Sequence, residues 1–213
     1  NAVVTAAVLA STALLPVLLL GNSAGAAQLN NRFIDMSGNQ TSDGSGRDGG
    51  DAFGQDVTYR VGFDLNQAHA NIRGIVVDFC SNSPIIGDAC TAPTGFDVNE
   101  GSVLVTANTG ITGTWAVDAA TDANTIILTN ASGDNLAAAA PVALTLGSNA
   151  AADGITNPTT TGTFYARIVT YLATASAAGY TSANPNAVGA RRDDGGVAMS
   201  VANELTVTAR VQE

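Results

Sequence analysis

The chain has 213 residues, of which 46% are hydrophobic and only 12% are charged, and its formal net charge at pH 7 is −10. This charge argues against a nucleic-acid partner, because the phosphates would be repelled. All eight basic residues are arginine, so the chain lacks both the lysine of a GxxxxGK[ST] phosphate-binding loop and the lysine amine of isopeptide-linked pili. The composition favours a β-rich exported protein over a cytosolic enzyme.

The first segment, residues 2–20 (AVVTAAVLASTALLPVLLL), carries no charge. As a helix it would be about 28 Å long at ~1.5 Å per residue, close to the thickness of the hydrocarbon core of a bilayer. Small residues recur at helical spacing in its first half, so neighbouring helices can approach closely, and its proline is expected to kink it. The residues expected to pack in this way are Ala2, Ala6, Ala10, Ala13, Leu14, Pro16 and Leu18.

Two interpretations of this segment remain open. In the first it is a secretory signal peptide, because the small residues at 21–27 offer a cleavage site that would leave Ala27 or Gln28 as the first residue. In the second it is a helix retained after upstream processing, since neither a methionine nor a positively charged region stands before Ala2. Whether the segment is cleaved or retained decides whether it contributes to the function of the mature protein.

A retained apolar helix followed by a β-rich head resembles the type IV pilins and the archaeal-type pilins. The resemblance covers about the first 25 residues and the general plan of the chain. Bacterial type IV pilins carry a glutamate at the fifth position, where this chain has Thr5, so the archaeal-type pilins are more similar. The resemblance implies a helix held in the inner membrane before assembly and then packed in the core of an extracellular filament, with the β-domains outside.

Strand patterns follow a short neck in chain order. Residues 57–65 alternate between apolar and polar, and 72–79 are continuously apolar, which predicts a central strand. Long loops are expected at 38–55 and 173–195. The remaining expected strands are 29–37, 102–106, 113–117, 125–129, 141–146, 163–172 and 197–211.

The predicted fold class is therefore mainly β with one long N-terminal α-helix. The helix and neck form one unit, residues 1–28, and the head domain, residues 29–213, is an antiparallel β-sandwich of the immunoglobulin-like or jelly-roll type. The last strand is either an ordinary strand of the sandwich or one that pairs with a neighbouring subunit. Its residues for such pairing are Val201, Leu205, Val207 and Val211.

Candidate chemical sites are few. Cys80 and Cys90 flank a loop with a proline and a glycine, which predicts a disulfide worth roughly 2–3 kcal/mol. A metal site would need more ligands than these two sulfurs, and His69 is the only histidine. Because no GxSxG elbow accompanies that histidine, we expect no enzyme, no catalytic residue, no cofactor and no metal.

Two weaker motifs lie in the polar segments. Asp43, Asp48 and Asp51, and the expected turn at Asp193-Asp194, offer oxygen ligands for calcium, although solvated turns are the simpler interpretation. Asn39 and Asn130 each begin an N-x-[ST] sequon.

These observations support one leading functional hypothesis and one alternative. The leading hypothesis is a structural subunit of a cell-surface filament, a homopolymer that contacts the membrane through residues 2–20 before assembly and binds no nucleic acid. The alternative is a secreted or membrane-tethered β-sandwich protein, an adhesin or a component of a surface layer, whose first segment is a signal peptide.

Overall fold

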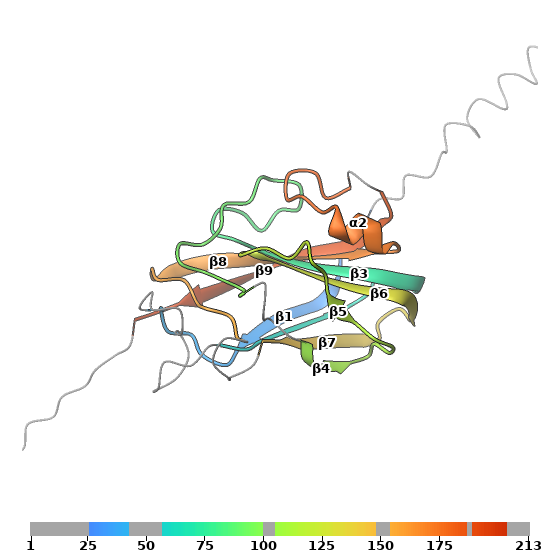
Figure 1. Ribbon diagram of the computed structural model, residues 1–213, viewed down its shortest axis with the longest axis horizontal. Helices are drawn as coiled ribbons and strands as arrows, with labels where there is room; N and C mark the ends of the chain where they lie inside the picture. Colours follow the sequence, from blue (N-terminus) through green and yellow to red (C-terminus); the bar gives the residue numbers. More distant parts are fainter. Residues whose placement is uncertain (1–25, 43–56, 100–104, 148–153, 187–188, 204–213) are drawn as a thin grey trace, which may run out of the picture.

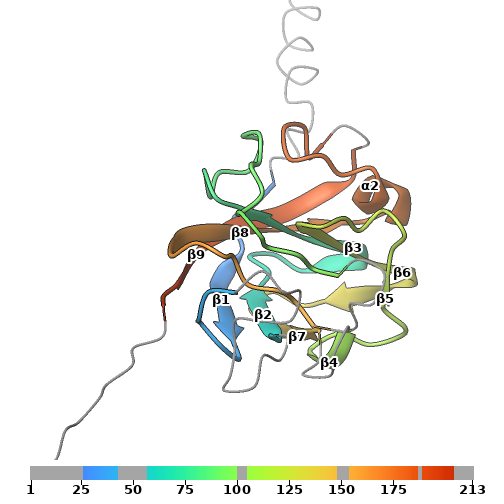
Figure 2. The ribbon, with the colours of Figure 1, turned by 60° about the vertical axis from the view of Figure 1, so that its left-hand side comes forward.

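The computed structural model describes residues 26–42, 57–99, 105–147, 154–186 and 189–203. Two antiparallel sheets pack face to face, as Figures 1 and 2 show. The four-stranded sheet has the order β1-β2-β7-β4, and the five-stranded sheet has the order β5-β6-β3-β8-β9. The strands are β1 Asn30–Met36, β2 Tyr59–Asp64, β3 His69–Cys80, β4 Val105–Thr109, β5 Ala116–Val117, β6 Thr125–Leu136, β7 Pro141–Leu146, β8 Gly162–Tyr171 and β9 Arg191–Val201.

The predicted fold class is wrong in its long N-terminal helix. The described residues contain two sheets and one helix of five residues, α2 (Thr174–Ala178). The sheets bury a shared core between them, so no long helix contributes to this fold within the described ranges. The expected helix at residues 2–20, with every packing residue that we assigned to it, lies outside the described residues.

No helix in the described ranges combines the length and the apolar character that crossing a membrane requires.

The core lies between the two sheets and follows from the alternation of the strands. In β2 the side chains of Tyr59, Val61 and Phe63 are buried, while Arg60 between them is exposed. The rings of Tyr59, Phe79, Phe96 and Phe164 contact one another at centroid distances of 4.7–6.2 Å. Burying each such side chain contributes about 1.5–3 kcal/mol, so this aromatic group is a main source of cohesion.

A ring-over-glycine contact joins β1 to β2. Phe33 is the cross-strand partner of Gly62, and a Cβ atom on that glycine would lie 2.0 Å from the Phe33 ring. The ring also meets the guanidinium of Arg60, whose central carbon is 4.8 Å from the ring centroid. The glycine therefore provides the space that the phenylalanine fills.

The five-stranded sheet is covered on its outer face as well. Val76, Ile127, Val169 and Tyr171 form a second apolar cluster there with Ala177 of α2, and the helix lies over the five-stranded sheet in Figure 1. The loop expected at 173–195 is thus wrong in two places, since it contains α2 and the first residues of β9. Strand β3 is central, between β6 and β8, as the apolar run at 72–79 predicts.

The two sheets meet along one side, where β1 runs beside β9 (Figure 2). Isolated parallel bridges pair Gln28 with Asp194 and Gln40 with Ala202, at either end of β1. Between these bridges β1 pairs only with β2, and β9 pairs only with β8, among the described strands. Backbone bridges therefore join the two sheets at both ends of this side, and between the bridges β1 and β9 are not paired with each other.

Candidate functional site

A buried arginine lies beneath the disulfide loop, residues 81–91. Arg167 is in the middle of β8, and its side chain is fully buried on the outer face of the sheet. Its Nε and Nη2 donate to the carbonyl of Ser83 at 3.0 and 2.9 Å, and its Nη1 donates to the carbonyl of Asp88 at 2.7 Å. Arg167 thereby holds both arms of the loop against the sheet.

Asp78 of β3 is the cross-strand partner of Arg167. Its Oδ2 lies 3.7 Å from the arginine Nη1 and accepts the hydroxyl of Tyr180 at 2.7 Å. Its Oδ1 accepts from Asn124 at 3.3 Å and from Thr125 at 3.4 Å. We call Arg167, Asp78 and Tyr180 the buried clamp.

Burial controls the electrostatics of the clamp. Loss of hydration raises the pKa of Asp78, and the Tyr180 hydroxyl and the Arg167 charge offset only part of this increase. Burial also raises the pKa of Tyr180, and the neighbouring carboxylate raises it further. Groups with shifted pKa values often cluster at functional sites, but structural ion pairs shift pKa values as well. Here, however, both carboxylate oxygens already accept hydrogen bonds from within the fold.

The expected disulfide is present, with the Sγ atoms of Cys80 and Cys90 2.09 Å apart and the Cα atoms 5.2 Å apart. Cys80 is the last residue of β3. Backbone bonding from Ser81 to Thr91 at 2.7 Å and the bond from the Asn82 amide to the Ala89 carbonyl at 2.8 Å close the loop above it. The loop is therefore held by a covalent bond, by its own hydrogen bonds and by Arg167.

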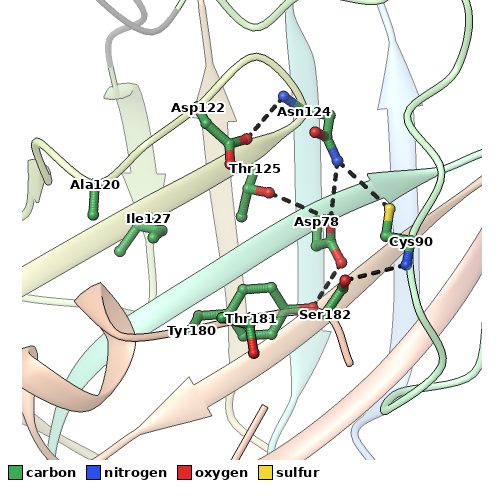
Figure 3. Close-up of a pocket in the computed structure, with 10 residues that line it drawn as sticks. All are labelled: Asp78, Cys90, Ala120, Asp122, Asn124, Thr125, Ile127, Tyr180, Thr181 and Ser182. Carbon is green, nitrogen blue, oxygen red and sulfur yellow. Dashed lines mark hydrogen bonds between the residues drawn. The ribbon is translucent and has the colours of Figure 1, made fainter. Parts of the chain in front are cut away.

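A pocket of about 250 Å³ opens beside the clamp, and Figure 3 shows the side chains around it. Its wall includes the Cys90 backbone, whose N–H donates to the Ser182 hydroxyl at 3.1 Å. The size and polarity suit a small polar molecule. The residues that line it are Asp78, Cys90, Ala120, Asp122, Asn124, Thr125, Ile127, Tyr180, Thr181 and Ser182.

One cluster in the described part of the chain has the composition of a metal site. Ligand atoms of Asp78, Cys80 and Cys90 lie within 4.8 Å of one another. The two sulfurs are bonded to each other, and the metal ligand is a thiolate rather than a disulfide sulfur. In this oxidised state the cluster offers one carboxylate, which is too few ligands for a structural zinc ion.

His69 lies at the other end of the five-stranded sheet. Its Nε2 is 3.3 Å from Oδ1 of the buried Asp193. The expected turn at Asp193-Asp194 is wrong, because both residues belong to β9. The hydroxyl of Thr170 donates a hydrogen bond to the carbonyl of Asp193 and accepts one from its N–H. Asp43, Asp48 and Asp51 lie outside the described residues.

The two sequons have different surroundings. Asn39 is exposed, whereas only 2% of Asn130 is exposed. The Asn130 Oδ1 accepts from the backbone N–H groups of Ser132 and Gly133 at 3.0 and 3.3 Å. Asn130 therefore stabilises a bend within β6 in the folded chain.

Of the residues expected to pair with a neighbouring subunit, Val201 is described. It is buried in β9 and pairs with Gly162 of β8. The other three, Leu205, Val207 and Val211, lie outside the described residues.

The buried clamp was not predicted from the sequence. A signal for it exists, because Asp78 interrupts the apolar run IVVDF and Arg167 interrupts the run FYARIV. One acid and one base, each inside an apolar strand, indicate a buried ion pair, since such charges are almost never buried alone.

Comparison of the chain with models of protein families, with curated proteins and with solved structures finds no match.

Proposed function

We propose that this protein is a structural subunit of a cell-surface assembly, an extracellular filament built from copies of the same chain. The two-sheet domain faces outward, and the uncharged residues 2–20 provide the apolar surface through which copies associate. Before assembly the same residues contact the membrane. Neither catalysis nor a cofactor is part of this proposal.

The observation that carries the proposal is the disulfide loop with the buried clamp beneath it. Disulfides persist in exported proteins and are rare in the reducing cytosol, so the bond between Cys80 and Cys90 favours an extracellular location. The donor groups of Arg167 are directed at loop carbonyls and at Asp78 rather than at solvent. These contacts stiffen the domain, which suits a subunit that bears load.

The composition gives independent support. A chain with few charges and no lysine offers no side-chain amine for covalent polymerisation, so assembly must rely on packing. Burying the side chains of a 19-residue apolar segment would remove well over ~1,000 Å² of surface from water, on the order of 25 kcal/mol before ordering costs.

A second candidate function is a secreted or tethered adhesin that acts as a monomer. The observation in its favour is the pocket of about 250 Å³ beside the disulfide loop, because polar groups from three segments of the chain converge on it. In this case residues 2–20 would be removed during export.

The test is to express the full chain in an exporting host and to image the cell exterior by electron microscopy. We expect filaments, and an intact mass that includes Asn1. Ala6→Leu enlarges a small residue of the apolar segment and should abolish the filaments without changing the urea midpoint of the monomer. Ala175→Leu makes the same change at an exposed position of α2 and should leave filaments intact.

Normal filaments from Ala6→Leu would contradict the role of residues 2–20. A mass that begins near Gln28, on a protein that remains monomeric at the surface, would contradict the filament and support the adhesin.

A further inference from the structure

The outer edge of β9 makes backbone–backbone hydrogen bonds at its two ends, and none between them are made by the described residues. Asp194 exchanges hydrogen bonds with Ala27 and Leu29, and Ala202 exchanges them with Asn39 and Thr41. The pairing of β9 with β8 is continuous from Asp194 to Val201. Because backbone groups on an antiparallel strand alternate in direction, every even-numbered residue in this span directs its N–H and C=O away from β8.

The residues between these two anchors leave that edge open. The carbonyl of Gly196 accepts Nε of Arg32 at 3.3 Å. Ala198 and Ser200 are exposed, and among the residues that the structure describes nothing bonds their outward N–H and C=O groups. An open edge of this kind is a template for another strand.

A groove of about 360 Å³ runs along this open edge. Its apolar side chains come from both sheets: Ile34 and Met36 are half-buried on β1, and Met199 on β9 is 7% exposed. No charged residue is among the described residues that line it, which are Ile34, Met36, Asn39, Thr163, Ala198, Met199 and Ser200. The core of the sandwich is therefore incompletely covered where the backbone is also unpaired.

We propose that this groove binds an extended strand, residues 205–211, from a second copy of the chain. The inference rests on the proposed function, since it supplies a contact between subunits of the same polymer. The strand adds to the edge of β9 through backbone hydrogen bonds, and its alternate side chains cover the groove. This is β-strand addition with specificity from side-chain pockets.

The sequence of the strand, LTVTARV, fits both faces of the site. Leu205, Val207, Ala209 and Val211 fall on one face and would cover the apolar groove. Thr206, Thr208 and Arg210 fall on the other face, beside the exposed Ala198 and Ser200. At ~3.3 Å per residue the strand spans roughly 20 Å, enough to cover the outward backbone groups of Ala198 and Ser200.

The second copy is favoured over the same chain by the bonds at Ala202. A tight hairpin at Asn203 and Glu204 would pair residue 205 with Ala202 through the outward backbone groups of Ala202. Those groups already bond Asn39 and Thr41. The strand of the same chain would therefore need groups that are already bonded in order to turn directly into the groove, whereas the strand of a neighbour can reach Ala198 and Ser200 without using the groups of Ala202.

The experiment is disulfide trapping between two singly substituted full-length chains, one of them isotopically labelled. Ala198→Cys and Thr208→Cys are mixed and mildly oxidised. We expect mixed dimers at least tenfold above those from Thr109→Cys with Thr208→Cys, because Thr109 is exposed on the edge strand of the other sheet. Residues directly opposite each other on paired antiparallel strands have Cα atoms ~4.5–5.5 Å apart, within the ~4.4–6.8 Å that a disulfide spans.

A second pair of variants keeps the proposal falsifiable if trapping is perturbed by the new cysteines. Ser200→Pro removes one outward N–H and leaves the pairing with β8 in place, which an edge strand tolerates. Ser200→Ala is the matched control, because it keeps the N–H. We expect association of the purified chains, measured by analytical ultracentrifugation, to weaken about tenfold in the proline variant alone, the effect of losing roughly one hydrogen bond.

Equal trapping at Ala198 and Thr109, or unchanged association of Ser200→Pro, would overturn the inference. So would an intrachain disulfide in the monomeric double variant A198C/T208C, since it would place the strand of the same chain in the groove. Filaments on cells without trapping would leave the proposed function standing and reject this contact. Disulfide-trapped pairs from cells that form no filaments would support this contact and reject the filament as the proposed function.

Discussion

The buried clamp and the open edge of β9 lie on the same five-stranded sheet but differ in how their polar groups are hydrogen-bonded. In the clamp, Arg167 and Asp78 are almost wholly buried and find their partners inside the fold. At the edge, Ala198 and Ser200 are exposed and direct backbone groups outward without a described partner. The polar groups of the clamp are bonded within the fold, whereas the backbone groups at the edge face solvent and are where we propose that a second strand binds.

This difference separates stability from association. A buried polar group costs free energy unless it is bonded, so changes in the clamp act on the folded state. An exposed backbone group is already solvated, so changes at the edge act on what binds there. A variant that weakens the clamp should therefore leave the yield of the mixed disulfide between Ala198→Cys and Thr208→Cys unchanged, provided that it is measured where the variant is folded.

The largest effect is expected from Arg167→Met. It leaves the Asp78 charge and the carbonyls of Ser83 and Asp88 without their cationic partner. Breaking a buried ion pair from one side costs about 3–5 kcal/mol, so the free energy of unfolding in urea should fall by that amount. Arg60→Met is the control: it removes an exposed pair with Asp35 and the contact with the Phe33 ring, and the loss should stay below about 2 kcal/mol.

The double variant R167M/D78L sharpens this prediction. With no uncompensated charge left, it should recover part of the lost stability. A double variant that is less stable than Arg167→Met would show that the loop carbonyls, and not the ion pair, account for the effect.

A smaller effect is expected from removing the disulfide. The variant C80S/C90S opens a loop with a sequence separation of 10 residues, which corresponds to roughly 2–3 kcal/mol in the chain-entropy model. The domain should stay folded, because Arg167 still holds Ser83 and Asp88. Thermal unfolding with and without reductant, on the wild type and on this variant, measures the loss. A loop that is cleaved by protease as soon as the bond is removed would contradict the holding role of Arg167.

The smallest effect concerns pH and Asp78→Asn. Burial raises the pKa of Asp78 in the folded protein, so protonation favours folding. This contribution is complete below the unfolded pKa of about 3.9 and is lost as the pH rises through the folded pKa. The wild type should therefore lose stability relative to Asp78→Asn across that window, by about 1.4 kcal/mol for each tenfold difference between the folded and unfolded acid dissociation constants.

Urea midpoints of both proteins from pH 3 to pH 7 provide the measurement. The opposite trend, in which Asp78→Asn becomes less stable relative to the wild type as the pH rises, would mean that attraction to the Arg167 charge outweighs the cost of burying the Asp78 carboxylate. Asp194, whose pKa burial also raises, is unchanged in both proteins and cancels in the comparison.

The sequence predicts those strands whose pattern reflects a single core. Strand β7 has the bounds of the expected strand 141–146, and in β2 the predicted apolar face is buried, although Gly62 and Asp64 on the opposite face are buried as well. Strand β6 runs to Leu136 rather than stopping at 129, because Asn130 to Gly133, which have the composition of a turn, do not end it. The structure accommodates them as a bulge opposite a register shift in β3, with Gly133 at a φ of 73°.

The sequence could not predict the second layer on the five-stranded sheet. An alternating strand assigns Arg167 to a solvent-facing side, yet α2 and the disulfide loop cover that face. Likewise RRDDGG lacks apolar residues, and its place in β9 depends on pairing with Tyr171 and Val169 from a distant segment. Both errors arise because tertiary neighbours, which local pattern does not encode, decide burial.

The contact of the Phe33 ring with Gly62 has an evolutionary consequence. Because the ring occupies the space of the missing Cβ, an aromatic residue compensates a glycine that would otherwise weaken β2. Neither position is free to change alone: a side chain at 62 expels the ring, and a small residue at 33 leaves a hollow beside the backbone. Homologues that share this sheet should therefore substitute the two positions together, and this covariation would identify the pairing of β1 with β2 from sequence alone.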